Sequence, residues 1–334
     1  MSYQNSNVDE GKKDSVTALD GPIFLLSAAR SGGTMLARVL NCHPDLVIWG
    51  EHVGFINRLA EIDHMVTRVG HLMYPKTNDM IADFIAFPDH RLTGFEPWVN
   101  PFDHATFRQS CRDMIEKMFT RGLSPGQRWG FKEVRYHRVS TVQFLLELFP
   151  GSQFVILSRD TKQVVESSIL ASWSLRWFWE YRDAMPSALA EAIVRDTTYA
   201  LLAIEVGLTE VRTHLGSRCL HLDYAQLIEP SRGFVAPLFS FLGVSVSDAV
   251  ADRIRRVLAV RSGSTERDVC FGGILTPTFI RERVAALTPE MRAEIARDGV
   301  DRCRLSAREG IGQYTFLMGD HTMRDRGSEF SSLF

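Results

Sequence analysis

Residues 23–36 read Ile-Phe-Leu-Leu-Ser-Ala-Ala-Arg-Ser-Gly-Gly-Thr-Met-Leu, and this stretch decides the fold. The apolar run at its start predicts a short buried strand, and the pattern from Thr34 to Leu40 predicts a helix. A strand, a tight loop of small residues and a helix start form the arrangement of a phosphate-binding loop. Its backbone N–H groups and helix dipole converge on an anion. A plain strand–turn–helix is the alternative that small residues alone permit.

The loop differs from that of a nucleotide triphosphatase at one position. Such a loop carries Gly-Lys-Ser/Thr, and its lysine reaches the terminal phosphates. Here Gly33 stands before Thr34, where the lysine would be, and the nearest cation is Arg30. The sequence therefore predicts a cradle for a phosphate-like anion, with its cation placed before the glycines.

Composition excludes several classes of function. The chain has 334 residues, 45% hydrophobic and 23% charged, which is typical of a globular protein. A net charge of −2 gives no electrostatic footprint for DNA or RNA. The five cysteines are scattered, which argues against a disulfide framework or a zinc site, and no other metal site is expected. The sequence shows no signal peptide and no membrane span, so we expect a cytoplasmic protein.

The segments that follow predict one α/β domain at 21–319, with a central parallel sheet flanked by helices. Further strands are expected near 46–49, 128–134, 154–157 and 219–222. Residues 1–20 should form a disordered arm and 320–334 a mobile tail. The block 53–125 is interpreted as an insertion that covers an acceptor site. The aromatic segment 172–181 either lines that site or packs a helix.

Two candidate catalytic residues follow the strand expected at 46–49. Ligands of open α/β sheets bind just beyond the carboxyl ends of the strands, so Glu51 and His52 should share a rim with Arg30. A carboxylate there can act as a general base, and so can an imidazole, whose ordinary pKa suits the task. The alternative for Glu51 is a role in the first turn of the next helix.

Taken in order, four pieces of the chain resemble the family of sulfotransferases that use 3′-phosphoadenosine 5′-phosphosulfate (PAPS). The pieces resemble, in turn, the 5′-phosphosulfate loop, the 3′-phosphate motif, the late tyrosine motif and a C-terminal helix start. They are Arg30 to Thr34, Leu157 to Ser167, Asp223 to Leu227 and Leu287 to Glu290. The pattern looks nearer to tyrosylprotein and bacterial carbohydrate or small-molecule sulfotransferases than to cytosolic phenol and steroid enzymes.

The resemblance implies a P-loop NTPase-like three-layer fold with helical insertions. It also implies transfer of the sulfuryl group from PAPS to a hydroxyl or amine of a small-molecule, carbohydrate or peptide acceptor. The displacement would be in line and would need no metal. Glu51 would be the general base, with His52 as the competing base. Arg30 and Lys132 would stabilise the leaving phosphate. The implied donor-binding set is Arg30, Ser31, Gly32, Gly33, Thr34, Arg159, Ser167 and Tyr224.

Two departures from the family pattern leave other functions open. Gly33 replaces the usual Thr or Ser, and Thr161 replaces a common Pro or Gly. The first rival is a P-loop kinase for a small molecule, with Asp160 as its magnesium ligand. The second is a nucleotide-binding protein without catalysis. A scaffold with an aromatic interaction surface is the third.

Overall fold

A computed structural model describes residues 21–70, 104–171, 183–229, 233–260 and 272–299, together with Ala82, Ile85, Ala86 and Tyr181. The expected arm at 1–20, the tail at 320–334 and residues 172–180 of the aromatic segment lie outside the described residues. Five strands form one parallel sheet in the order β2-β3-β1-β4-β5. The strands are β1 (Ile23–Ser27), β2 (Leu46–Trp49), β3 (Arg128–Glu133), β4 (Gln153–Ser158) and β5 (Cys219–Asp223). The predicted α/β class with a central parallel sheet flanked by helices is confirmed.

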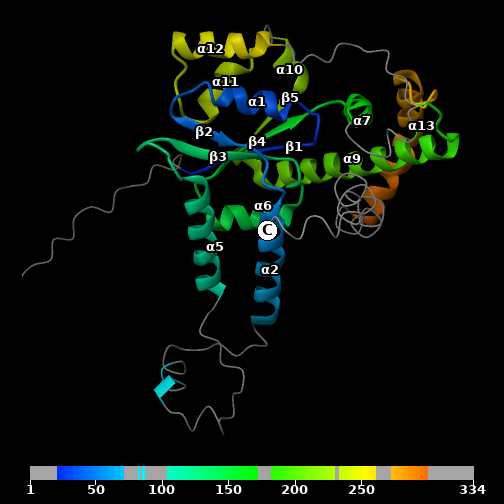
Figure 1. The fold of residues 1–334 in the computed structure, drawn as a ribbon. Coiled ribbons are helices and arrows are strands. Elements are labelled where there is room, and N and C mark those ends of the chain that lie inside the picture. The colour runs from blue at the N-terminus through cyan, green and yellow to red at the C-terminus, as the bar shows by residue number, and fades with distance from the viewer. Residues whose placement is uncertain are drawn as a thin grey trace, which may run out of the picture.

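Helices cover both faces of the sheet (Figure 1), and side chains alternate between them along β1. Ile23 and Leu25 pack in one core with helices α1, α11 and α12. Phe24 and Leu26 pack in the other core with α6 and α9. These helices are α1 (Gly33–Leu40), α6 (Val139–Leu148), α9 (Ser187–Leu215), α11 (Val235–Phe241) and α12 (Asp248–Ala259). Because β1 is completely buried in the middle of the sheet, the loop that follows it has a rigid base.

The remaining helices extend the two sides of the sheet. Helices α2 (Phe55–Gly70) and α5 (His104–Phe119) pack together and against α6, and Figure 1 shows both reaching well beyond the sheet. They belong to the block 53–125, whose role as a cover for the acceptor stays a prediction. Helices α7 (Thr161–Leu170) and α13 (Pro277–Asp298) pack with α9. The short elements are η2 (Gly216–Arg218) and α10 (Tyr224–Ile228).

One expectation is wrong. Leu287 to Glu290 was expected to start a helix, but it lies inside α13, with Pro289 in the helix interior. The helix begins ten residues earlier, where the Thr276 side chain accepts a hydrogen bond from the Phe279 amide and Pro277 occupies the first turn. Proline suits that first turn because its missing N–H would have no partner there. The Thr-Pro pair at 276–277 is thus the true helix start.

Candidate active site

The loop between β1 and α1 needs glycine at position 32. Gly32 has a φ of 94°, a region that favours glycine. A Cβ there would also lie 2.6 Å from the ring of Tyr224. Arg30 takes a positive φ of 62°, and Ser31 is buried. The chain therefore makes a tight turn whose backbone is packed directly under an aromatic ring.

Gly33 is explained by what lies beside it. A Cβ at this position would lie 2.6 Å from the hydroxyl oxygen of Ser27 and 3.0 Å from Cε of Lys132. The Ser27 hydroxyl is buried, and it makes no hydrogen bond within the part of the chain that the structure describes. The Lys132 side chain comes from β3, and glycine lets it lie against the loop. Glycine at position 33, in place of the usual Thr or Ser, thus leaves room for the Lys132 side chain beside the loop.

On the β4 and β5 side, the other predicted donor-binding residues contact the loop. Arg159 Nη1 donates to the carbonyl of Arg30 at 3.0 Å, and its guanidinium carbon lies 4.3 Å from the ring centre of Tyr224. Arg30 Nε donates to the hydroxyl of Ser167 at 3.3 Å. Asp160 caps α7 by accepting from the Gln163 amide. Three segments far apart in the sequence therefore meet at the loop between β1 and α1.

On the β2 and β3 side, a carboxylate lies between two cations. Lys132 Nζ forms an ion pair with Glu51 Oε1, and Arg135 Nη1 lies 3.2 Å from Glu51 Oε2. The Lys132 side chain is only 10% exposed, whereas that of Glu51 is 36% exposed. A partly exposed carboxylate can meet an acceptor while the lysine stays against the loop.

His52 occupies a different environment from Glu51. Its ring packs edge-on against Phe55, Phe119 and Phe131, and its Nε2 lies 2.6 Å from the Tyr136 hydroxyl. Burial lowers the pKa of His52, although the nearby Glu133 carboxylate acts in the opposite direction. Burial also raises the pKa of the Tyr136 phenol. The lowered pKa favours the neutral imidazole, and Nε2 is engaged by the buried Tyr136 phenol.

Glu133 is a buried acid to which the sequence assigned no role. Its side chain is completely buried, and its two oxygens accept hydrogen bonds from backbone amides and from Arg135. Burial alone would raise the pKa of Glu133, but the His52 amide and the Arg135 guanidinium outweigh it and lower this pKa. A carboxylate at the end of β3, directly after Lys132, was the available signal.

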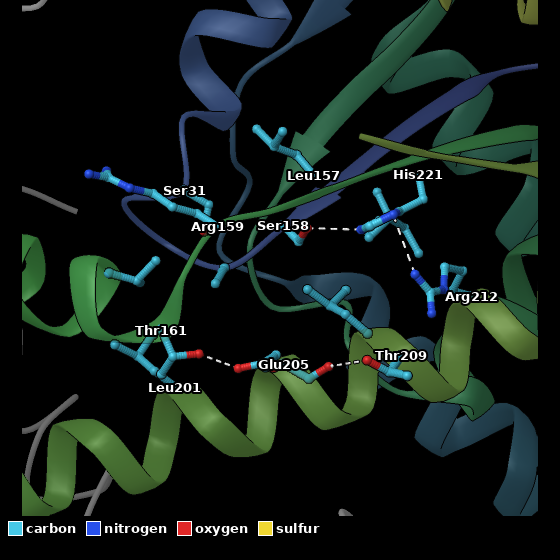
Figure 2. A pocket seen from close by; sticks show the side chains of 14 residues that line it. Ser31, Leu157, Ser158, Arg159, Thr161, Leu201, Glu205, Thr209, Arg212 and His221 are labelled. Atoms are coloured by element: carbon cyan, nitrogen blue, oxygen red, sulfur yellow. Dashed lines mark hydrogen bonds between the residues drawn. The ribbon is translucent and has the colours of Figure 1, made fainter. Parts of the chain in front are cut away.

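A cavity of about 200 Å³ lies between the ends of β4 and β5 and helix α9 (Figure 2). Arg212 Nη1 donates to His221 Nδ1 at 3.3 Å, and His221 Nε2 lies 2.9 Å from the Ser158 hydroxyl. Burial and the Arg212 charge lower the pKa of His221. Arg159 points away from this pair in Figure 2. Residues of the loop, β4, β5, α7 and α9 line this cavity, and Glu51 is not among them.

No group of three or more His, Cys, Asp and Glu side chains among the described residues is arranged to hold a metal ion. Within the same residues, none of the helices combines the length and apolar character that crossing a membrane requires.

The parallel sheet, with a tight loop and a helix after its central strand, defines a P-loop-like α/β protein. The model of the sulfotransferase family matches residues 22–248, which is more than half of the chain, and the chain belongs to this family. Sulfuryl transfer is therefore its class of reaction.

Several solved structures are similar to this chain. The sulfotransferase STF9 from Mycobacterium avium is 13% identical, with a TM-score of 0.45 over 84% of this chain and 77% of that one. The sulfotransferase domain of the Synechococcus PCC 7002 olefin synthase is 18% identical, with a TM-score of 0.41 over 82% and 94%. Mouse sulfotransferase SULT7A1, solved in complex with PAP, is 14% identical, with a TM-score of 0.38 over 89% and 88%.

Proposed function

We propose that the protein transfers the sulfuryl group of PAPS to a hydroxyl or amine of a small-molecule, carbohydrate or peptide acceptor, with Glu51 as general base. The observation that carries this proposal is the position of Lys132. Its side chain lies against Gly33 of the anion loop, and its ammonium forms an ion pair with Glu51. One cation therefore stands between the cradle for the donor and the base for the acceptor.

The loop fits an adenosine phosphosulfate donor. A Cβ would fill the cradle at both Gly32 and Gly33, so the backbone N–H groups can approach an anion closely. The buried Ser27 hydroxyl lies beside them. Arg159 and Ser167 would hold the 3′-phosphate, and Tyr224 would line the nucleotide site.

In an in-line displacement, Glu51, Lys132 and Arg30 would each have a different role. Glu51 would take the proton of the acceptor while the new O–S or N–S bond forms. The S–O bond to the 5′-phosphate would break, leaving adenosine 3′,5′-bisphosphate. Lys132 would stabilise the charge that develops on the leaving oxygen. The Arg30 guanidinium lies with Ser167, so it would stabilise the phosphates rather than contact the base.

Glu51 is favoured over His52 because of their surroundings. The Glu51 carboxylate is partly exposed beside Lys132, whereas the His52 ring is enclosed by aromatic side chains and bound to Tyr136. The kinase alternative needs a lysine at position 33, where even a Cβ meets Ser27 and Lys132.

A binding experiment tests the donor. Adenosine 3′,5′-bisphosphate should bind much more tightly than ATP with magnesium. The Arg159→Ala variant should lose about 10- to 100-fold of that preference, since a hydrogen bond to a charged group contributes about 1.5–3 kcal/mol. Arg195→Ala, which changes an exposed arginine of α9, is the control. Equal binding of the two nucleotides would refute the assignment of the donor.

A kinetic experiment tests the base. In single-turnover transfer of labelled sulfate, Glu51→Gln should be slower by about 10²–10⁴-fold, the range typical of a general base. His52→Asn should stay much closer to the parent rate. The reverse order would make His52 the base. Tight bisphosphate binding without transfer to any acceptor of a broad hydroxyl and amine panel would favour the noncatalytic alternative.

A further inference from the structure

The four-residue segment from Glu51 to Gly54 has an unusual backbone. Val53 has a φ of 57°, although its side chain is branched at Cβ. Such a conformation costs about 1–3 kcal/mol and persists only where surrounding contacts enforce it. The Val53 side chain is 82% exposed, so its own packing does not enforce it. The backbone of this segment must be held by something else.

Glu133 provides the contacts that hold the segment. Its Oε2 accepts hydrogen bonds from the His52 amide at 3.1 Å and the Gly54 amide at 3.0 Å, the two amides that flank Val53. Its Oε1 accepts from the Val134 amide at 2.9 Å. A buried carboxylate with this many donors is fixed in place, because moving it would leave an unpaired charge in the interior.

Arg135 connects this carboxylate to Glu51. The same nitrogen, Nη1, lies 2.7 Å from Glu133 Oε1 and 3.2 Å from Glu51 Oε2. Lys132 holds the other oxygen of Glu51. Both oxygens of the Glu51 carboxylate are therefore held, one by Lys132 and one by the guanidinium that also binds Glu133.

We propose that Glu133 is a positioning residue for the base Glu51, acting through the backbone of residues 52–54 and through Arg135. The proposal rests on the proposed function, because it needs Glu51 as the base. A reactive group misplaced by 1 Å can cost about 10²-fold in rate. Loss of the Glu133 contacts should therefore slow the transfer step without weakening donor binding.

A double-mutant cycle tests this role. Glu51→Gln, Glu133→Gln and the double variant are compared by single-turnover transfer, with the affinity for adenosine 3′,5′-bisphosphate as the check of an intact site. Glu133→Gln alone should be slower by about 10²-fold. In the Glu51→Gln background the same change should have no further effect, because the group that it positions is gone.

The outcomes separate this inference from the function on which it rests. Fully additive effects would overturn the positioning role, since Glu133 would then act independently of Glu51. A Glu51→Gln variant as fast as the parent would refute Glu51 as base, whatever Glu133 does. Hydrogen exchange of the His52 and Gly54 backbone amides can be measured without a sulfuryl acceptor. Their exchange rate should rise in Glu133→Gln. Protection from exchange equal to that of the parent would show that Glu133 does not hold these two amides.

If Glu133→Gln does not fold, a substitution at a more exposed residue tests the same connection to Glu51. Arg135→Gln removes the link at a side chain that is 43% exposed, and Arg112→Gln on α5, also 43% exposed, is its matched control. Arg135→Gln should slow transfer roughly tenfold, since one charge-assisted contact to Glu51 is lost. The control should leave the rate unchanged. Equal rates for the two variants would overturn the role of Arg135.

Discussion

Replacing Gly33 by alanine tests how closely the loop and Lys132 are fitted. The φ of Gly33 is not positive, so alanine suits the backbone and would by itself gain about 0.4–1 kcal/mol of stability. The new methyl group would, however, lie 2.6 Å from the buried Ser27 hydroxyl and 3.0 Å from Cε of Lys132. Overpacking of this kind costs about 1–3 kcal/mol. We therefore expect a net loss of roughly 1–2 kcal/mol.

The rate of sulfuryl transfer should also fall, and by more than the loss of stability alone would explain. Lys132 would have to move away from the loop, and displacement of a stabilising cation costs about 10²-fold in rate. Urea unfolding gives the stability, and single-turnover transfer gives the rate. Bisphosphate binding shows whether the site is still formed.

A second substitution makes the reasoning refutable. In Ser27→Ala/Gly33→Ala the clashing oxygen is gone, and the nearest remaining Ser27 atom is Cβ at 3.6 Å. Stability should return to the parent value, because the lost hydroxyl makes no hydrogen bond to a described residue. The rate should recover only in part, since Lys132 still meets the methyl group. A Gly33→Ala variant with parental stability and rate, or a double variant as unstable as Gly33→Ala, would refute the argument.

Three further predictions concern single residues. Burial lowers the pKa of His52, so the unfolded chain binds this proton more readily, and stability should fall as pH drops below about 6.5. His52→Gln should flatten this part of a urea-unfolding series from pH 7.5 to 5.5, and an unchanged slope would contradict it. Gly32→Ala should abolish bisphosphate binding, since its φ is 94° and its Cβ would meet the Tyr224 ring; calorimetry that shows parental affinity would disprove this. Asn41→Ala removes two hydrogen bonds to the Ile48 backbone and should cost about 1–3 kcal/mol in thermal unfolding, whereas a change below about 0.5 kcal/mol would speak against it.

Local sequence patterns predicted the helices and strands well, because each of these elements depends mainly on its own residues. The strand expected at 46–49 has those bounds in the structure, and the helix expected from Thr34 to Leu40 runs from Gly33 to Leu40. Helix α9 runs from Ser187 to Leu215 and packs against α6. Gly207 inside it lies against the carbonyl of His137, where a Cβ would come within 2.3 Å. A close approach of this kind depends on tertiary packing, so it leaves no local signal.

Most residues of the candidate site were named from the sequence, but Glu133 and the contacts between these residues were not. Strand ends placed Arg30, Glu51 and Arg159 on one rim, as the structure has them. The fit of Lys132 against Gly33 joins two strands that are far apart in the sequence, and only the strand order makes them neighbours. Glu133 acts on backbone amides of another segment, and no spacing within the sequence encodes that geometry. The catalytic roles of these residues stay predictions.

The central strand of the sheet is also the first to leave the ribosome. Ile23 pairs with Gly130 on one side and with Gln153 on the other, so both partners of β1 are synthesised much later. At about 5–20 residues per second, β1 stays unpaired for roughly ten seconds. Pairings this distant in sequence also form slowly, because a long loop must close first. A nascent chain that ends before β4 therefore leaves β1 unpaired on one side, and the loop that follows β1 lacks that support.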